Sequence, residues 1–273
     1  MVVWPISASV IERRFDDGQE NQPVRPARAL YMIVFRLLRI LLHLALGLWT
    51  CALVFPLTDA AGRAWRIQHW SSGLLAICRI TVEIRRHGVD ALPTRAVVVA
   101  NHVSWLDIFV INTMQPCRFV AKSDIRSWPM LGWLSAQAGT IFIARGRVRE
   151  VRRIFENLVQ SIRDGDHVAF FPEGTTAAQG TLLPFHANLF EAAIDADVPI
   201  QPLALRYLDA DGKLAEQANF TGDTSFADSM LTILRSGRMR AELIVLPPIA
   251  STGAHRRELA SAAQAVICTG LDH

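Results

Sequence analysis

An apolar run of eighteen residues, from Ile40 to Leu57, places the strongest constraint on how this chain folds. His43 is its only basic side chain. A helix with a rise of about 1.5 Å per residue makes such a run about 27 Å long, close to the thickness of a bilayer's hydrocarbon core. Hydrophobic residues also make up 51% of the chain, more than an ordinary core needs. The sequence therefore predicts a membrane-associated helix.

Basic residues flank this run on both sides, so the distribution of positive charge favours no direction of crossing. The flanking arginines are Arg25, Arg28, Arg36, Arg39, Arg63, Arg66, Arg79, Arg85 and Arg86. We expect a turn near Pro56 and a weaker returning helix with Trp65 and Trp70, whose rings suit the headgroup zone. Residues 29–80 are thus predicted to form a membrane-embedded helical hairpin with both ends in the cytosol. A single span and a buried soluble helix are the alternatives.

The flanking segments differ from this hairpin. Residues 1–28 contain Pro23 and Pro26 and carry charge where a signal peptide is apolar, which predicts a mobile tail. From residue 81 short β-branched runs alternate with amphipathic stretches, which is typical of α/β folds. Strands are expected at 81–86, 96–100, 118–121, 140–144, 167–171, 200–207 and 240–246, and helices at 105–114, 147–164, 186–196, 224–236 and 254–268. Residues 81–273 are therefore predicted to form one domain with a mixed, largely parallel sheet flanked by helices.

Charge and cysteine content exclude several classes of function. The formal net charge of +3 is smaller than a dedicated nucleic-acid binder requires, so anionic lipid is the expected partner and nucleic acid is not. The four cysteines are scattered and show neither zinc-ligand nor redox spacing. We therefore predict reduced thiols on the cytosolic side and no metal site or bound cofactor.

The clearest chemical pattern joins a buried strand to a polar turn and a helix, in the segment from Val97 to Asp107. His102 follows the strand, and Asp107 comes five residues later. Such a pair can act as a general base and the carboxylate that orients it, which activates a hydroxyl. Ser104 and Asp107 also match a helix capping box, so Asp107 has a purely structural alternative.

Asn101-His102-x4-Asp107 resembles the H-x4-D motif of the lysophosphatidate acyltransferase family. Three more of that family's motifs follow in order, at Gly139–Gly146, Phe171–Thr175 and Val198–Pro202, and the resemblance spans about residues 80 to 250. It implies that His102 is the general base and Asp107 its orienting partner. The substrate-binding residues that it implies are Arg145, Gly146, Glu173, Gly174, Thr175 and Lys122.

Physical arguments support some of these assignments. The planar guanidinium of Arg145 can grip phosphate oxygens bidentately, and Gly146 follows it directly. Glu173 can accept from acceptor hydroxyls or brace Arg145, while Gly174 allows close approach of the backbone to a ligand. For Lys122 the resemblance alone implies contact with the headgroup, because it falls where the family tends to carry a lysine, and simple exposure is the alternative.

Two positions depart from the family's commonest form. Thr176 stands where an arginine is frequent, and His186 stands where a lysine commonly follows the Pro-Phe pair. The loss of two fixed positive charges weakens the case for a strongly anionic acceptor. Lysophosphatidate is the expected acceptor, giving phosphatidate, and another lysolipid such as lyso-ornithine lipid is the alternative.

The predicted reaction moves a fatty acyl group from acyl-CoA or acyl carrier protein to the hydroxyl of a lysophospholipid. The enzyme is expected at the cytoplasmic membrane, with its catalytic domain on the cytosolic face. Two other functions are the alternatives. A hydrolase would direct the His102–Asp107 pair at water, and a lipid-binding scaffold is disfavoured because it would need no such pair.

Overall fold

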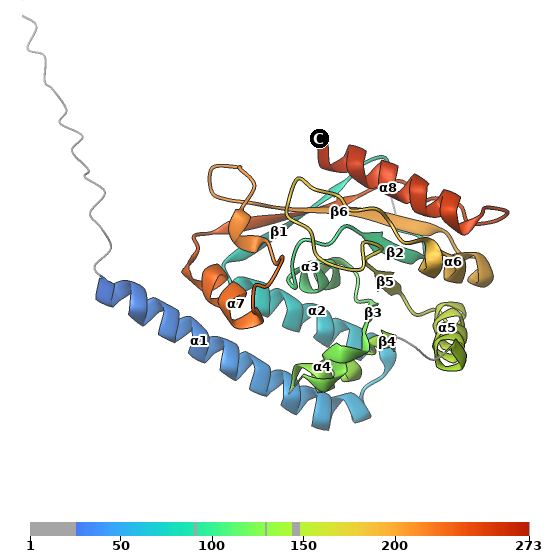
Figure 1. Ribbon diagram of the computed structural model, residues 1–273. Helices are drawn as coiled ribbons and strands as arrows, with labels where there is room; N and C mark the ends of the chain where they lie inside the picture. Colours follow the sequence, from blue (N-terminus) through green and yellow to red (C-terminus); the bar gives the residue numbers. More distant parts are fainter. Residues whose placement is uncertain (1–25, 90–91, 129, 144–147, 273) are drawn as a thin grey trace, which may run out of the picture.

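The computed structural model describes residues 26–89, 92–128, 130–143 and 148–272. The helix α1 begins at Pro26, so the last residues of the predicted tail belong to a helix, and residues 1–25 lie outside the described part. Seven strands form one sheet in the order β1-β7-β6-β2-β5-β3-β4 (Figure 1). They are β1 (Ile80–Arg86), β2 (Val97–Ala100), β3 (Arg118–Lys122), β4 (Ile141–Ile143), β5 (Val168–Phe170), β6 (Ile200–Leu208) and β7 (Met239–Val245).

All neighbouring strands run parallel except β6 and β7, which are antiparallel. This confirms the predicted mixed, largely parallel sheet, and each strand lies where the sequence placed it to within one or two residues. The carboxyl ends of β2, β3, β4, β5 and β6 consequently meet at one edge of the sheet. In α/β folds that edge is where ligands bind.

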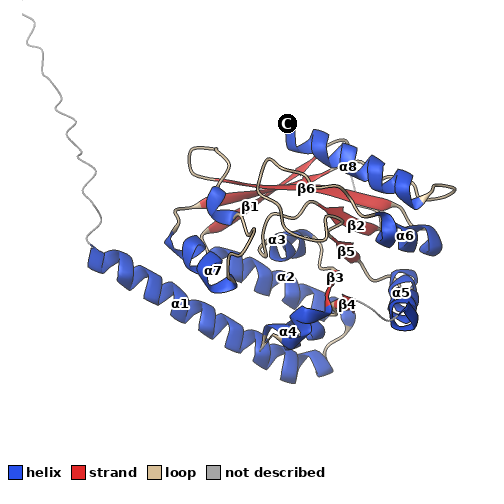
Figure 2. Cartoon of the chain, viewed as in Figure 1, coloured by secondary structure: helices blue, strands red, loops and turns tan. Residues whose placement is uncertain are grey.

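Helices cover both faces of the sheet (Figures 1 and 2). The α-helices are α1 (Pro26–Trp49), α2 (Ala60–Ile77), α3 (Asp107–Met114), α4 (Leu131–Gln137), α5 (Val148–Arg163), α6 (Glu191–Ala196), α7 (Phe226–Arg235) and α8 (Arg256–Asp272). On one face α2, α3 and α7 share a core with Leu203 and Leu205, while on the other α5, α6 and α8 pack with Ala204. This alternation along β6 follows from the two-residue repeat of a strand.

Two details differ from the helices expected from sequence. The segment predicted as one helix over 186–196 is a 3₁₀ turn, Ala187–Phe190, followed by α6. The short helix α4 was not predicted, because seven residues are too few to show a convincing helical period. Gly132 lets α4 pack closely, since a Cβ atom there would lie 2.3 Å from the carbonyl oxygen of Arg126.

The first two helices form a pair. The helical run continues from α1 through a π turn (Thr50–Val54) and a 3₁₀ turn (Phe55–Leu57), and α2 returns alongside α1 (Figure 1). His43 stacks on Trp70 with ring centroids 4.7 Å apart, and the Trp70 indole donates to the His43 carbonyl over 3.0 Å. Gly47 also lies against the Trp70 ring. The two helices are therefore joined by specific side-chain contacts.

The two helices meet the rest of the chain differently. Leu74, Leu75 and Ile77 of α2 are buried in the same core as the sheet, so α2 is an integral layer of the domain. In α1 large apolar side chains lie exposed along its length: Leu30, Tyr31, Met32, Val34, Phe35, Leu38, Leu41, Leu42, Leu46 and Trp49. Leu30–Leu57 is long and apolar enough to cross a membrane, with only 17% of its most apolar stretch buried. Exposed apolar surface of this extent is typical of a membrane-facing helix.

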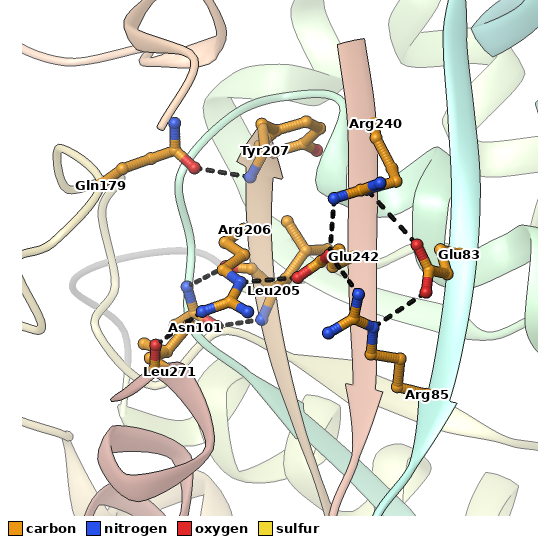
Figure 3. A network of polar contacts seen from close by, with 10 residues as sticks. All are labelled: Glu83, Arg85, Asn101, Gln179, Leu205, Arg206, Tyr207, Arg240, Glu242 and Leu271. Atoms are coloured by element: carbon orange, nitrogen blue, oxygen red, sulfur yellow. Dashed lines mark hydrogen bonds and ion pairs between the residues drawn. The ribbon is translucent and has the colours of Figure 1, made fainter. Parts of the chain in front are cut away.

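An ion-pair network ties together the three strands at one side of the sheet (Figure 3). The buried carboxylate of Glu242 lies 2.8 Å from Arg85, 2.7 Å from Arg206 and 3.2 Å from Arg240. Arg206 also donates to the carbonyl of Leu271, near the end of α8. The network therefore ties β6 to β7 and to α8. It lies on the face of the sheet opposite to the side chains of Leu205 and Tyr207, the odd-numbered residues of β6.

Candidate active site

The candidate site begins where β2 ends, in a loop that the neighbouring strand holds in place. The side-chain amide of Asn101 donates to the Leu205 carbonyl over 2.9 Å and accepts from the Leu205 backbone N–H over 2.8 Å (Figure 3). This pair of hydrogen bonds fastens the end of β2 to β6. His102 therefore leaves the sheet from a fixed point.

The structure brings His102 and Asp107 together, as the spacing predicted. The Nδ1 atom of His102 lies 2.8 Å from Oδ2 of Asp107. The imidazole stacks on Phe171 with ring centroids 3.9 Å apart and 7° between the planes. Asp107 is fully buried, whereas the histidine side chain keeps 18% of its surface exposed. With Nδ1 engaged by the carboxylate, Nε2 is the ring nitrogen that can take a proton from a substrate.

Asp107 accepts four hydrogen bonds in all. Besides His102, the backbone N–H groups of Val103 and Ser104 donate to Oδ2 over 2.7 and 2.9 Å, and the Tyr207 hydroxyl donates to Oδ1 over 2.7 Å. The capping alternative is thus partly realised, because Asp107 does satisfy backbone donors before α3. The same carboxylate also holds the imidazole, so the two roles coexist.

Tyr207 is the site residue that the sequence did not indicate. Its ring is fully buried, and its backbone N–H donates to the Gln179 side chain over 2.6 Å (Figure 3). Burial, with the nearby Asp107 charge as the second cause, raises the pKa of this phenol well above its ordinary value. Tyr207 therefore stays a neutral hydrogen-bond donor. A tyrosine inside a buried apolar strand carries no local signal of this role, since its partner lies one hundred positions earlier.

Glu173 holds the backbone of the catalytic loop. Its Oε1 accepts from the His102 N–H over 2.7 Å, and its Oε2 accepts from the Leu183 N–H over 2.9 Å. The loop is further held by the Ala177 N–H, which donates to the His102 carbonyl over 2.8 Å. Because β2 and β5 are adjacent and parallel, the segments that follow them meet at this point. Glu173 therefore supports the polypeptide around His102, and the predicted brace to Arg145 stays a prediction.

The side chain of Glu173 is 4% exposed. Burial raises its pKa above the ordinary value, and the two backbone N–H groups oppose that shift in part. Both carboxylate oxygens are engaged by the chain itself, so its contact with an acceptor hydroxyl stays a prediction. Arg145, its other predicted partner, and Gly146 lie outside the described residues.

The turn after Glu173 is open to solvent. Gly174 and Thr175 are exposed, and Gly174 has φ +69°, a conformation that favours glycine. A Cβ atom at Gly174 would also lie 3.3 Å from the ring of His186, so a histidine does border this turn where the family commonly has lysine. The Thr176 hydroxyl donates to the carbonyl of Phe220, which directs it into the fold.

Lys122 is exposed at the carboxyl end of β3. That strand end belongs to the same edge of the sheet as His102, and β4, which precedes Arg145, ends there as well. The topology thus brings the ends of all the motif strands to one edge. Contact of Lys122 with a headgroup stays a prediction.

An apolar cavity of about 150 Å³ lies next to the site, between α1, α2, α3 and α4. Its walls include Gly47 of α1, Ile67 of α2, Phe109 of α3, Phe119 of β3 and Leu134 of α4. Phe119 stacks on Phe171, with ring centroids 5.9 Å apart, and Phe171 stacks on His102. Two stacked aromatic rings therefore link a wall of the cavity to the His102 imidazole.

In the part of the chain that the structure describes, no three histidine, cysteine, aspartate or glutamate side chains are grouped to hold a metal ion. The site is built instead from a histidine, a buried carboxylate and their hydrogen-bond partners. This arrangement can withdraw a proton from a hydroxyl.

Comparison with known proteins agrees with this geometry. A family model described as Acyltransferase matches residues 83–206. A lyso-ornithine lipid O-acyltransferase from Pseudomonas aeruginosa is 36% identical over 241 residues, covering 86% of this chain and 92% of the relative. The chain belongs to the lysophosphatidate acyltransferase family. It is therefore an acyltransferase that acts on a lysolipid, and the exposed α1 helix agrees with association with a membrane.

Other members extend the comparison. A 1-acyl-sn-glycerol-3-phosphate acyltransferase from Neisseria meningitidis is 41% identical over 148 residues, covering 54% of this chain and 58% of the relative. The crystal structure of the 1-acyl-sn-glycerophosphate acyltransferase PlsC from Thermotoga maritima superposes with a TM-score of 0.64 at 20% identity. It covers 91% of this chain and 97% of that protein, which shows that the fold is shared.

Proposed function

We propose that this acyltransferase moves a fatty acyl group from a thioester donor directly to a lysolipid hydroxyl, with His102 as the general base. The observation that carries the proposal is the 2.8 Å bond between His102 Nδ1 and the buried Asp107, because it leaves Nε2 to face the substrate. Nε2 takes the hydroxyl proton as the oxygen attacks the thioester carbonyl. The tetrahedral intermediate then expels the thiolate, which receives that proton from the imidazolium.

Asp107 stabilises the imidazolium in this sequence, and the Tyr207 hydroxyl keeps the carboxylate in position. No acyl-enzyme and no cofactor are required, since the acceptor oxygen attacks directly. The acyl donor is proposed to be acyl-CoA or acyl carrier protein. The cavity between α1 and α4 supports this, because an apolar space beside the catalytic ring suits a fatty acyl chain.

For the acceptor, we propose lyso-ornithine lipid first and lysophosphatidate second. The relatives that act on lyso-ornithine lipid cover more of the chain, at 86% and 71%, than the 54% of the Neisseria enzyme. Thr176 and His186 replace two cations in this chain, and the ornithine headgroup, with its own ammonium, needs fewer fixed positive charges than a phosphate monoester. The sequence motifs alone favoured lysophosphatidate over lyso-ornithine lipid as the acceptor. This proposal reverses that order.

The catalytic domain is proposed to lie on the cytosolic face of the cytoplasmic membrane. Thioester donors are cytosolic, and α1 exposes apolar side chains while α2 packs on the domain. The site then opens at headgroup depth, so the acyl chains of the acceptor stay out of water at a saving of about 0.8 kcal/mol per CH₂.

The test uses purified protein with labelled acyl-CoA or acyl carrier protein and the two lysolipids in turn. We expect diacyl lipid, and we expect His102→Ala to lower the rate about 10²–10⁴-fold with an unchanged melting temperature. His87→Ala, at an exposed histidine, is the matched control and should keep full activity. Free fatty acid as the main product indicates a hydrolase, and full turnover in His102→Ala rules out the mechanism.

A further inference from the structure

The short segment from Lys122 to Gln137 exposes apolar side chains that the fold leaves uncovered. Trp128 is 41% exposed, Met130 is 55% exposed and Trp133 is 42% exposed, all within six positions. We call these three residues the aromatic segment, after the two tryptophans. Side chains of this size are normally buried, so such a cluster on a small surface marks an interaction site.

The aromatic segment adjoins the exposed apolar face of the amino-terminal helices. Trp133 lines one open apolar hollow together with Leu48, Trp49, Ala52 and Leu53. Figure 1 shows α4 beside the carboxyl-terminal part of α1, so segments about eighty positions apart share one surface. The apolar face of α1 therefore continues onto α4.

The backbone at Met130 is also unusual. Met130 has φ +59° and ψ −50°, a sparsely populated positive-φ conformation that costs a non-glycine residue about 1–3 kcal/mol. Helix α4 begins at the next residue. The fold leaves more than half of the Met130 side chain uncovered.

Charge indicates which partner fits. Lys122, Asp124 and Arg126 are exposed on the same segment and leave it a net charge of +1, and the Arg126 guanidinium lies over the Phe142 ring at 5.8 Å. Tryptophans beside cations are suited to the boundary of an anionic bilayer, where the indole sits at headgroup depth and the cation meets phosphate.

We propose that the aromatic segment is a second membrane contact, which inserts into the same leaflet that binds α1. A helix lying alone in a leaflet leaves the protein free to roll about the helix axis. A contact beside that axis removes the rotation and holds α4, one wall of the apolar cavity, against the leaflet. The inference rests on the membrane association of α1 and is independent of the acyl-transfer chemistry.

The test places an environment-sensitive fluorophore on Met130→Cys in the full chain, with Cys51→Ala and Cys268→Ser removing the accessible thiols. Cys78 and Cys117 stay unlabelled, because burial raises the pKa of each thiol to about 12. Leu42→Cys on α1 is the positive control. Leu214→Cys is the negative control, since Leu214 is 45% exposed away from this face.

With vesicles of phosphatidylcholine and phosphatidylglycerol, nitroxide-labelled lipids should quench the labels at 42 and 130 and leave the label at 214 unaffected. Quenching at 42 without quenching at 130 overturns the second contact, and quenching at neither overturns membrane association with it. A spectral shift at 130 that appears without vesicles and grows with protein concentration assigns the surface to a second copy of the chain and overturns the proposal.

A functional variant separates this contact from catalysis. Trp128→Ser combined with Trp133→Ser should weaken vesicle binding about tenfold or more, since burying one large side chain is worth about a decade in a partition constant. Acyl transfer to acceptor in vesicles should fall in step, while transfer to short-chain acceptor in detergent stays unchanged. Unchanged vesicle binding overturns the proposal, whereas equal loss in both assays assigns these residues to the fold.

Discussion

Replacing Tyr207 by phenylalanine removes one hydroxyl and nothing else, which isolates its bond to Asp107. The ring stays buried among the same neighbours, and the backbone bond to Gln179 is untouched. Asp107 then keeps three donors, namely His102 Nδ1 and the N–H groups of Val103 and Ser104. The variant therefore tests whether the fourth donor matters for catalysis or only for stability.

Magnitudes follow from the kind of bond that is lost. A hydrogen bond to a charged group contributes about 1.5–3 kcal/mol, so the free energy of unfolding should fall by that amount. For a chain of this size the melting temperature should drop by about 3–12 °C. A loss of alignment worth about 1.4 kcal/mol lowers kcat/KM about tenfold. This is smaller than the loss expected on removing His102, since Tyr207 acts through Asp107.

The pH dependence distinguishes a catalytic effect from a structural one. With one donor fewer, more negative charge stays on Asp107, and a more negative carboxylate holds the imidazolium proton more firmly. The acid limb of the kcat/KM profile should therefore move to higher pH, by at most about one unit, because one unit corresponds to about 1.4 kcal/mol. The assay is acyl transfer to a soluble short-chain acceptor from about pH 5 to pH 9.

Ser251→Ala is the matched control, because it also removes a buried hydroxyl. That hydroxyl donates to the Val198 carbonyl over 2.8 Å, and within the described part of the chain neither residue is hydrogen-bonded to His102 or Asp107. It should lower the melting temperature and leave the acid limb in place. A Tyr207→Phe enzyme with a lowered melting temperature but wild-type kcat/KM and pH profile would refute the positioning role.

Three further outcomes are expected. Glu173→Gln offers one acceptor oxygen to two backbone N–H groups, so its melting temperature should be lower. The raised pKa of Glu173 favours its protonated form in the fold, so the stability that this group contributes is present at low pH and is lost as pH rises. Thermal melts should therefore show that the difference in melting temperature between wild type and variant shrinks toward neutral pH. Arg145→Ala should raise KM for the acceptor and spare KM for the donor, and equal changes in both would contradict a headgroup contact. A thiol reagent at pH 8 should modify Cys268 quickly and spare Cys78 and Cys117 until the chain is unfolded, which counting labelled thiols by mass spectrometry checks.

The strands and the catalytic pair were accessible from sequence because their signals are local. Val97 to Val99 is a continuous β-branched run followed by Ala100, and such a run is typical of a buried parallel strand. His102 and Asp107 lie five positions apart on one turn, so their contact depends on the geometry of a single loop. The motif order then indicated the family without reference to tertiary contacts.

Other features depend on distant parts of the chain and were not predictable. Glu173 was expected to brace Arg145 or to accept from acceptor hydroxyls, and both stay predictions. The structure adds a contact with the His102 backbone, which was not foreseen because β2 and β5 become neighbours only in the folded sheet. In the same way α2, which reads as a weak membrane helix, is a layer of the core because α3 and β1 cover its apolar side.

The sequence by itself determined the α/β class, the seven strands, the apolar helix and the pairing of His102 with Asp107, since each rests on residues within one element or one turn. The tertiary structure alone decided that Tyr207 donates to Asp107, that Trp133 lies beside Leu53, and that an apolar cavity adjoins the catalytic ring. Those contacts join residues about fifty to one hundred positions apart, and only packing of the whole chain selects which distant side chains meet.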